Sequence, residues 1–91
     1  MSYIHITRTP SMGLADYRRV NEHLDSAPIA GRLAHYAGEQ SGTLLTVDIW
    51  QKRADADRFA AERLFPAFTA AGVRPSADTL ILAFDDEADH E

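Results

Sequence analysis

The 91-residue sequence contains no cysteine. Disulfide bonds, thiol catalysis, thiolate metal sites and iron–sulfur clusters are therefore excluded. Without covalent cross-links, a chain of this length buries only a modest share of its surface, and such domains are usually marginal in stability. Noncovalent contacts, within one chain or with a second copy, must supply the stability. The absence of cysteine also fits the cytoplasmic location that we expect.

The sequence also lacks clustered positive charge and long apolar runs. Nine Lys and Arg residues are scattered among 14 Asp and Glu residues, and the net charge is −5. A basic stripe is the electrostatic mark of nucleic-acid binding, so we expect no nucleic-acid partner. No apolar run approaches the roughly 20 residues of a membrane span. The first ten residues lack the basic start and apolar centre of a signal peptide, so we expect no membrane association.

Signatures of metal and nucleotide sites are missing as well. The four His residues show no H-x-H or H-E-x-x-H spacing, and no glycine-rich phosphate loop occurs. Haem would need an axial ligand for which only His35 is a candidate, and the sequence does not favour it. We therefore expect no cofactor.

The sequence does contain clear patterns of secondary structure. Segments rich in β-branched and aromatic residues predict four strands, at 3–8, 32–38, 43–50 and 79–85. Apolar residues spaced by three and four predict two helices, at 13–25 and 54–71. Pro66 should bend or break the second helix, and Gly72 suits its left-handed C-terminal cap.

The order of these elements predicts an α+β fold of the ferredoxin-like βαββαβ type. Its four-stranded antiparallel sheet would carry both helices on one face. We expect one domain over residues 1–91, with the acidic tail 86–91 frayed.

Both faces of the predicted strands are largely apolar. Residues 43–50 place Leu45, Val47 and Ile49 on one face, with Leu44 and Trp50 on the other. Two helices cover only one face, and a large exposed apolar patch is rare on monomers. We therefore expect a homodimer in which the uncovered sheet faces pack together.

One segment carries a family resemblance. Residues 31–68 contain Gly31 and His35, the triplet Asp48-Ile49-Trp50, Phe59, and the stretch Glu62-Arg63-Leu64-Phe65-Pro66. This segment resembles small bacterial proteins of the dimeric α/β-barrel superfamily, close to the antibiotic biosynthesis monooxygenase-like domains. Relatives usually cap the second helix with Ser just after the Trp-acidic pair. Here Gln51, Lys52 and Arg53 follow instead, so Asp55 is the next plausible cap.

The resemblance implies a homodimer with a pocket between sheet and helices for an apolar or aromatic substrate. The implied activity is cofactor-independent oxygenation, or proton transfer of the cyclase or isomerase type. The alternative is a non-catalytic dimeric module that binds a ligand or another protein.

His35 and Asp48 are the candidate catalytic residues. A His within a strand can act as a general base or orient a ligand, and the alternative is a hydrogen-bonded His of the core or interface. Asp48 lies two residues before Trp50 and so shares its face, where it could orient His35 or pair with an Arg. An even-numbered loop such as 39–42 would place His35 on that face. An odd-numbered loop such as 38–42 would place it on the other.

The candidate substrate-binding residues are Trp50, His5, Tyr17 and Phe59. Trp50 could form a pocket wall, or equally a core or dimer anchor. Tyr17 lies on the apolar stripe of the first helix, where its hydroxyl could reach a pocket. Tyr36 alternates with His35, so the two cannot face the same cavity.

Overall fold

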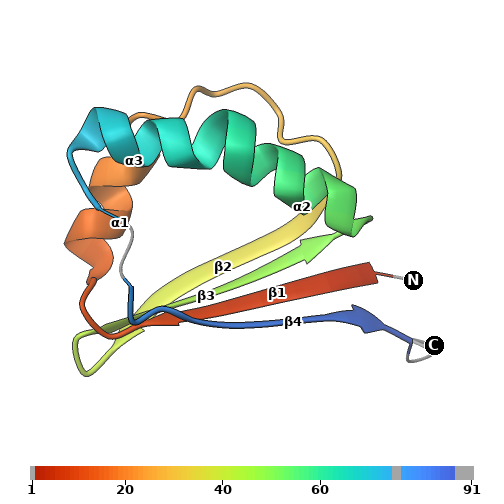
Figure 1. Ribbon diagram of the computed structural model, residues 1–91, viewed down its shortest axis with the longest axis horizontal. Helices are drawn as coiled ribbons and strands as arrows, with labels where there is room; N and C mark the ends of the chain where they lie inside the picture. The colour runs from red at the N-terminus through yellow and green to blue at the C-terminus, as the bar shows by residue number, and fades with distance from the viewer. Residues whose placement is uncertain (1, 75–76, 88–91) are drawn as a thin grey trace.

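A four-stranded sheet with helices on one side forms the computed structural model, which describes residues 2–74 and 77–87 (Figure 1). The elements in chain order are β1 (Ser2–Thr9), α1 (Leu14–Asn21), β2 (Arg32–Gln40), β3 (Thr43–Trp50), α2 (Arg53–Phe59), the π-helical segment η1 (Ala60–Leu64), α3 (Phe65–Ala71) and β4 (Leu80–Asp86). The strand order is β2-β3-β1-β4, and all neighbours are antiparallel. The predicted ferredoxin-like arrangement is confirmed.

The turn between β2 and β3 differs from the prediction of a 39–42 loop. Strand β2 continues to Gln40, which pairs with Thr43, and only Ser41 and Gly42 reverse the chain. Both have positive φ, 51° and 79°, as a type I′ hairpin turn requires. This even-numbered turn pairs His35 with Asp48 and so places His35 on the face of Asp48 and Trp50.

Helix α1 is shorter than the predicted 13–25. It begins after Gly13, where the Leu14 N–H donates to Glu39 Oε1 at 3.1 Å. At its end the N–H groups of His23 and Leu24 donate to carbonyls three residues back, at 3.0 and 3.1 Å. Such bonds tighten the last turn and satisfy terminal carbonyls. The chain has then left the helix before Asp25.

The second helical region, from Arg53 to Ala71, is a continuous curved rod, not one broken at Pro66 (Figure 1). The Phe65 N–H donates to the Ala60 carbonyl, five residues back, which is a π-type bond. This wider turn directly precedes Pro66, which has no N–H to donate. Gly72 has the predicted left-handed conformation, with φ of 69°.

The predicted capping role of Asp55 is wrong. The N-cap is Lys52, which makes no side-chain cap hydrogen bond. The Asp55 carboxylate instead contacts Arg58 at 3.3 Å and lies against Gly31. A Cβ at Gly31 would come within 2.2 Å of the Asp55 Oδ2 atom, and Gly31 has φ of +82°. A glycine is therefore required where the chain enters β2.

The buried residues lie between the sheet and the helices. They are Thr9, Met12, Val20, Leu44, Trp50 and Ala67. Strand β4 ends at Asp86, the first residue of the tail that was expected to fray. Residues 88–91 of that tail lie outside the described residues. Within the described ranges, no helix is long and apolar enough to cross a membrane.

Candidate active site

A row of polar side chains crosses the helix-facing side of the sheet. His35 of β2 pairs with Asp48 of β3, which pairs in turn with His5 of β1. Paired residues on adjacent strands project to the same face. Trp50 projects to that face as well, because its ring lies 5.5 Å from that of Phe59 in α2. The polar row therefore lies beneath the helices.

His35 is hydrogen bonded through both ring nitrogens. Its Nδ1 atom bonds to Asp48 Oδ1, and its Nε2 atom lies 2.5 Å from the Tyr17 hydroxyl oxygen. A carboxylate only accepts hydrogen bonds, so Nδ1 carries the proton in this contact. In the neutral ring, Nε2 then accepts from the Tyr17 hydroxyl. Helix α1 and strands β2 and β3 thus each supply one member of a linked set.

Arg32 extends this set to four residues. Its Nη1 atom lies 3.8 Å from Asp48 Oδ1, and the side chains of Arg32, His35 and Asp48 are 24%, 26% and 17% exposed. We call Tyr17, His35, Asp48 and Arg32 the relay. In this half-sheltered place the Arg32 guanidinium balances the Asp48 carboxylate, so the relay does not leave an unpaired anion under the helices.

A β-bulge explains how Arg32 reaches this face. Arg32 pairs with Trp50 and Ala34 pairs with Ile49, so Leu33 is an extra residue between the two pairs. In a regular strand, residues three apart such as Arg32 and His35 project to opposite faces. The bulge brings both onto the helix-facing side. Sequence reasoning missed Arg32, because counting alternate residues gives no sign of a bulge.

The threonines of the next row were also missed. Thr7 of β1 pairs with Thr46 of β3, and their hydroxyl groups hydrogen bond to each other beside the relay. The sequence could have indicated both threonines, because residues two apart in a strand project to the same face. Thr7 lies two residues from His5, and Thr46 lies two residues from Asp48. The helix-facing side is therefore polar over two successive rows.

The predicted aromatic residues Trp50 and Phe59 form a layered cluster. Trp50 is 2% exposed, so protein atoms surround its ring on nearly all sides. The guanidinium carbons of Arg32 and Arg63 lie 5.6 and 5.7 Å from the centre of the Phe59 ring, at cation–π distance. Arg32 thus connects the relay to this cluster.

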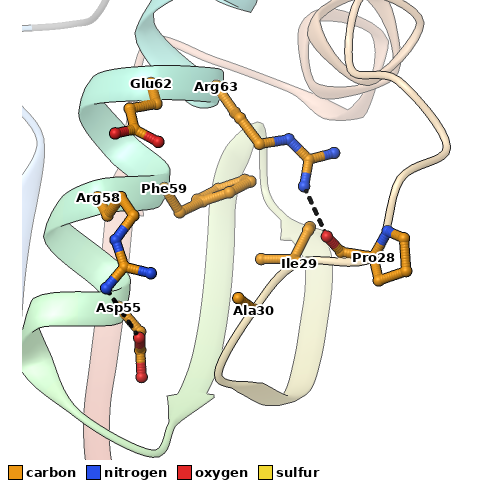
Figure 2. A pocket seen from close by; sticks show the side chains of 8 residues that line it. All are labelled: Pro28, Ile29, Ala30, Asp55, Arg58, Phe59, Glu62 and Arg63. Carbon is orange, nitrogen blue, oxygen red and sulfur yellow. Dashed lines mark hydrogen bonds and ion pairs between the residues drawn. The ribbon is translucent and has the colours of Figure 1, made fainter.

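Phe59 and Arg63 also line a small pocket. It has a volume of about 130 Å³ and lies between the helical region and the segment before β2. Figure 2 shows Arg63 reaching across to the Pro28 carbonyl, to which it donates at 3.2 Å. Arg63 also donates to the Asp25 carboxylate at 2.7 Å and to the Ala27 carbonyl at 3.1 Å. Arg63 therefore fastens this segment to the helices.

Neither this pocket nor a second one of about 160 Å³ beside the β2–β3 turn is lined by the candidate catalytic residues. Both are smaller than the roughly 300 Å³ at which pockets for drug-sized ligands begin. The row of His35, Asp48 and His5 ends instead at Ala83 of β4, which is exposed. Ile81, on the same side of β4, is 55% exposed. The helix-facing side of the sheet is thus open along β4.

The remaining candidates are not members of the relay. His5 is half-buried beside Asp48, and its ring centre is 6.4 Å from that of Tyr3. Tyr36 is 63% exposed and projects to the opposite face, as its alternation with His35 requires. Within residues 2–74 and 77–87, no three His, Asp or Glu side chains are grouped so that they could hold a metal ion.

The sequence matches no family model and no curated protein. Its fold, however, is similar to solved structures over nearly the whole chain. A protein from Chloroflexus aurantiacus, provisionally assigned as an antibiotic biosynthesis monooxygenase, has a TM-score of 0.70 and 12% identity, covering 100% of this chain and 98% of that one. SnoaB, a cofactor-independent oxygenase from Streptomyces nogalater, has a TM-score of 0.66 and 13% identity, with coverage of 97% and 95%.

A protein of unknown function from Nitrosomonas europaea is also similar, with a TM-score of 0.69, 18% identity and coverage of 99% and 93%. At these identities the similarity establishes the fold. The resemblance of residues 31–68 to antibiotic biosynthesis monooxygenase-like proteins is therefore confirmed for the fold. Activity does not follow from fold alone.

Proposed function

We propose that this chain is a small-molecule enzyme that removes a proton from an apolar or aromatic substrate at the relay. The oxygenases that share its fold, and cyclases or isomerases, need such a step. The observation that carries the proposal is the hydrogen-bonded chain from Tyr17 through His35 to Asp48, set on the sheltered side of the sheet. A polar network there is costly unless satisfied, and a role in chemistry accounts for it.

Asp48 and His35 have separate roles in this proposal. Asp48 holds the proton of His35 on Nδ1, which leaves Nε2 as the basic nitrogen. When the ring gains a proton, the Asp48 carboxylate stabilises the imidazolium. The substrate keeps the electron pair and becomes an enolate or phenolate, which can rearrange or react with molecular oxygen.

Substrate would enter from the β4 side. Ile81 and Ala83 offer an exposed apolar surface that leads to His5 and then to Asp48. A flat apolar molecule lying on this surface would bring its acidic group toward the relay. The buried Trp50 and the Phe59 ring would then shape the far end of the site, behind Arg32.

The proposal includes a homodimer formed through the sheet face that the helices leave uncovered. Leu80, Leu82 and Phe84 project to that face and are 51%, 54% and 49% exposed, next to Ile6 and Ile4 of β1. Such a contiguous apolar surface is typical of an interface between protein chains. A second copy presents the same surface and can cover it symmetrically.

One observation favours a non-catalytic module as the second candidate. The two pockets are small, at about 130 and 160 Å³. In that case the relay would only tie α1 to the sheet, and the protein would bind a ligand or partner without transforming it.

Anthrone in air is a direct test, because anthrone is a flat, apolar and enolisable ketone. Anthrone and one O₂ give anthraquinone and water, which absorbance and mass spectrometry follow. We expect the protein to accelerate this conversion, and His35→Gln to lower kcat by about 10²-fold or more. The matched control is His23→Gln, at an exposed histidine beyond the end of α1, which should keep full activity.

Two results would count against the proposal. No acceleration over buffer would remove oxygenation of enolisable ketones from the candidate functions. Full activity of a folded His35→Gln protein would remove His35 from the mechanism.

A further inference from the structure

We infer that the Tyr17 hydroxyl, not the His35 ring, is the group that contacts the substrate, and that His35 acts through it. The inference rests on the proposed function and refines it. The substrate class is a neutral molecule with a weakly acidic O–H or C–H group, a phenol or an enolisable ketone.

The first observation is that His35 has no ring nitrogen left for a substrate. Nδ1 bonds to Asp48, and Nε2 lies 2.5 Å from the Tyr17 oxygen. A histidine has only these two nitrogens, so a substrate proton could reach His35 directly only if Tyr17 moved away. The geometry as it stands makes Tyr17 the end member of the relay, so a substrate that enters past β4 and His5 extends over the Asp48–His35 pair to reach its hydroxyl.

The second observation is the hydrogen-bonding capacity left at Tyr17. A phenol hydroxyl donates one hydrogen bond and can accept others through two lone pairs. Its single donor is used on His35, so the lone pairs remain to accept a substrate proton. Tyr17 is half-buried, and its ring centre lies 5.8 Å from that of His35 at an angle of 37°. Helix α1 thus brings the Tyr17 hydroxyl to His35 from the helix layer that covers the sheet.

The proton transfer balances without a further reagent. The substrate proton moves to the Tyr17 oxygen while the hydroxyl proton of Tyr17 moves to His35 Nε2. Tyr17 ends as a neutral phenol, His35 as an imidazolium beside the Asp48 carboxylate, and the substrate as an anion. The reverse transfer returns the proton, so one relay serves as base and then as acid.

Acetylation by N-acetylimidazole tests the inference without any substrate. The reagent transfers its acetyl group to a phenol oxygen and releases imidazole, while the phenol proton passes to a base. If His35 takes that proton, acetylation of Tyr17 should slow by about tenfold or more in His35→Gln, since general-base assistance is worth at least that much. Peptide mass spectrometry measures acetylation of Tyr17, and N-acetyltyrosine amide added to each sample is the standard for reagent dose.

Asp48→Asn is the second variant, because it keeps the imidazole ring. An Asn amide can donate to Nδ1, which would move the ring proton to Nε2 and remove the acceptor for Tyr17. We expect the same loss of Tyr17 acetylation in this protein. Circular dichroism confirms that each variant is folded. An unchanged rate at Tyr17 in the folded variants would overturn the inference, because a purely structural hydrogen bond gives no base assistance.

The kinetic test uses anthrone with Tyr17→Phe, His35→Gln and the double variant. The inference predicts a similar fall in kcat of about 10²-fold for each, with little change in KM and no further loss in the double variant. His23→Gln is the control and should keep wild-type kcat. A Tyr17→Phe protein with normal kcat beside an inactive His35→Gln protein would overturn the inference but leave the proposed function intact. A wild-type protein inactive on anthrone but with His35-dependent acetylation would do the opposite.

Discussion

The distribution of polar and apolar side chains over the two faces of the sheet is the reverse of that in most antiparallel sheets with one solvent-exposed face. The face beneath the helices carries His5, His35, Asp48 and a threonine pair. The face away from the helices carries mostly apolar side chains, with Val47 at its centre. An antiparallel sheet with one face in water usually places apolar residues inward and polar residues outward. The proposed homodimer would account for the apolar outer face, and the proposed proton-transfer site would account for the polar inner face.

The largest expected effect follows from placing a charge on the outer face with Val47→Asp. Val47 lies at the centre of the sheet, paired with Ile6 and Tyr36. A carboxylate buried there without a partner costs several kcal/mol, so the proposed dimer should dissociate. Light scattering after gel filtration would report the mass. Ala54→Asp, at an exposed position in the first turn of α2, should leave the mass unchanged. A wild-type monomer at micromolar concentration would refute the covered-face interpretation.

The next effect tests whether the polar inner face serves stability. Asp48→Leu leaves His35 and Arg32 without their carboxylate and should reduce the free energy of unfolding by about 1–3 kcal/mol. Adding His35→Leu should recover the part of that loss that comes from the unpaired imidazole, because paired apolar side chains can replace a polar pair with little cost, whereas Arg32 stays without its carboxylate and Tyr17 loses its acceptor. Urea denaturation measures both. Asp57→Ala, in an ion pair that is 67–74% exposed, is the control and should change little.

If the double variant remains as unstable as Asp48→Leu alone, the relay would have a structural role that our interpretation does not give it. Recovery of stability together with loss of activity would support retention of the polar face for chemistry.

A smaller effect is expected at the Ser41-Gly42 turn, whose length determines which face of the sheet each residue of β2 occupies. Gly42 has φ of +79°, so Gly42→Ala should destabilise the protein by about 1 kcal/mol. Gly38→Ala is the matched control, since nothing lies within 4 Å of an added Cβ there. Thermal unfolding would compare the two. Equal melting temperatures for both variants would contradict the type I′ turn.

An effect of similar size is expected at the threonine pair. Thr7→Val alone leaves the Thr46 hydroxyl without its partner and should cost about 1 kcal/mol. The double change Thr7→Val and Thr46→Val should be close to neutral, because both polar groups leave together. A double-mutant cycle in urea gives the coupling energy. A coupling energy of zero would mean that the two hydroxyls do not interact in solution.

Much of the fold could be predicted because the patterns that specify it are local. The β-branched run at 43–50 gave β3 with its observed limits, and the alternation within it separated the two faces correctly. The early end of α1 depended on hydrogen bonds of His23 and Leu24 that compete with helix continuation. The continuous path through Pro66 depended on a π-type turn, a solution that helical periodicity does not display.

The candidate site was harder to predict because it depends on contacts between elements. The sequence indicated His35 and Asp48 by their residue types, but their contact required a two-residue turn that composition left open. Tyr17 was assigned to the apolar stripe of a helix, and only the fold brings its hydroxyl to His35. Their catalytic and substrate-binding roles remain predictions.

The extra residue at Leu33 has a consequence for the search for relatives. Arg32 and His35 are separated by two residues here, but without the bulge the same two positions on the sheet would be filled by an arginine and a histidine separated by one. A homologue with a one-residue deletion at this point could therefore keep the whole relay. An alignment that penalises the gap, or demands a fixed R-x-x-H spacing, would discard such a homologue. A comparison by three-dimensional position would retain it.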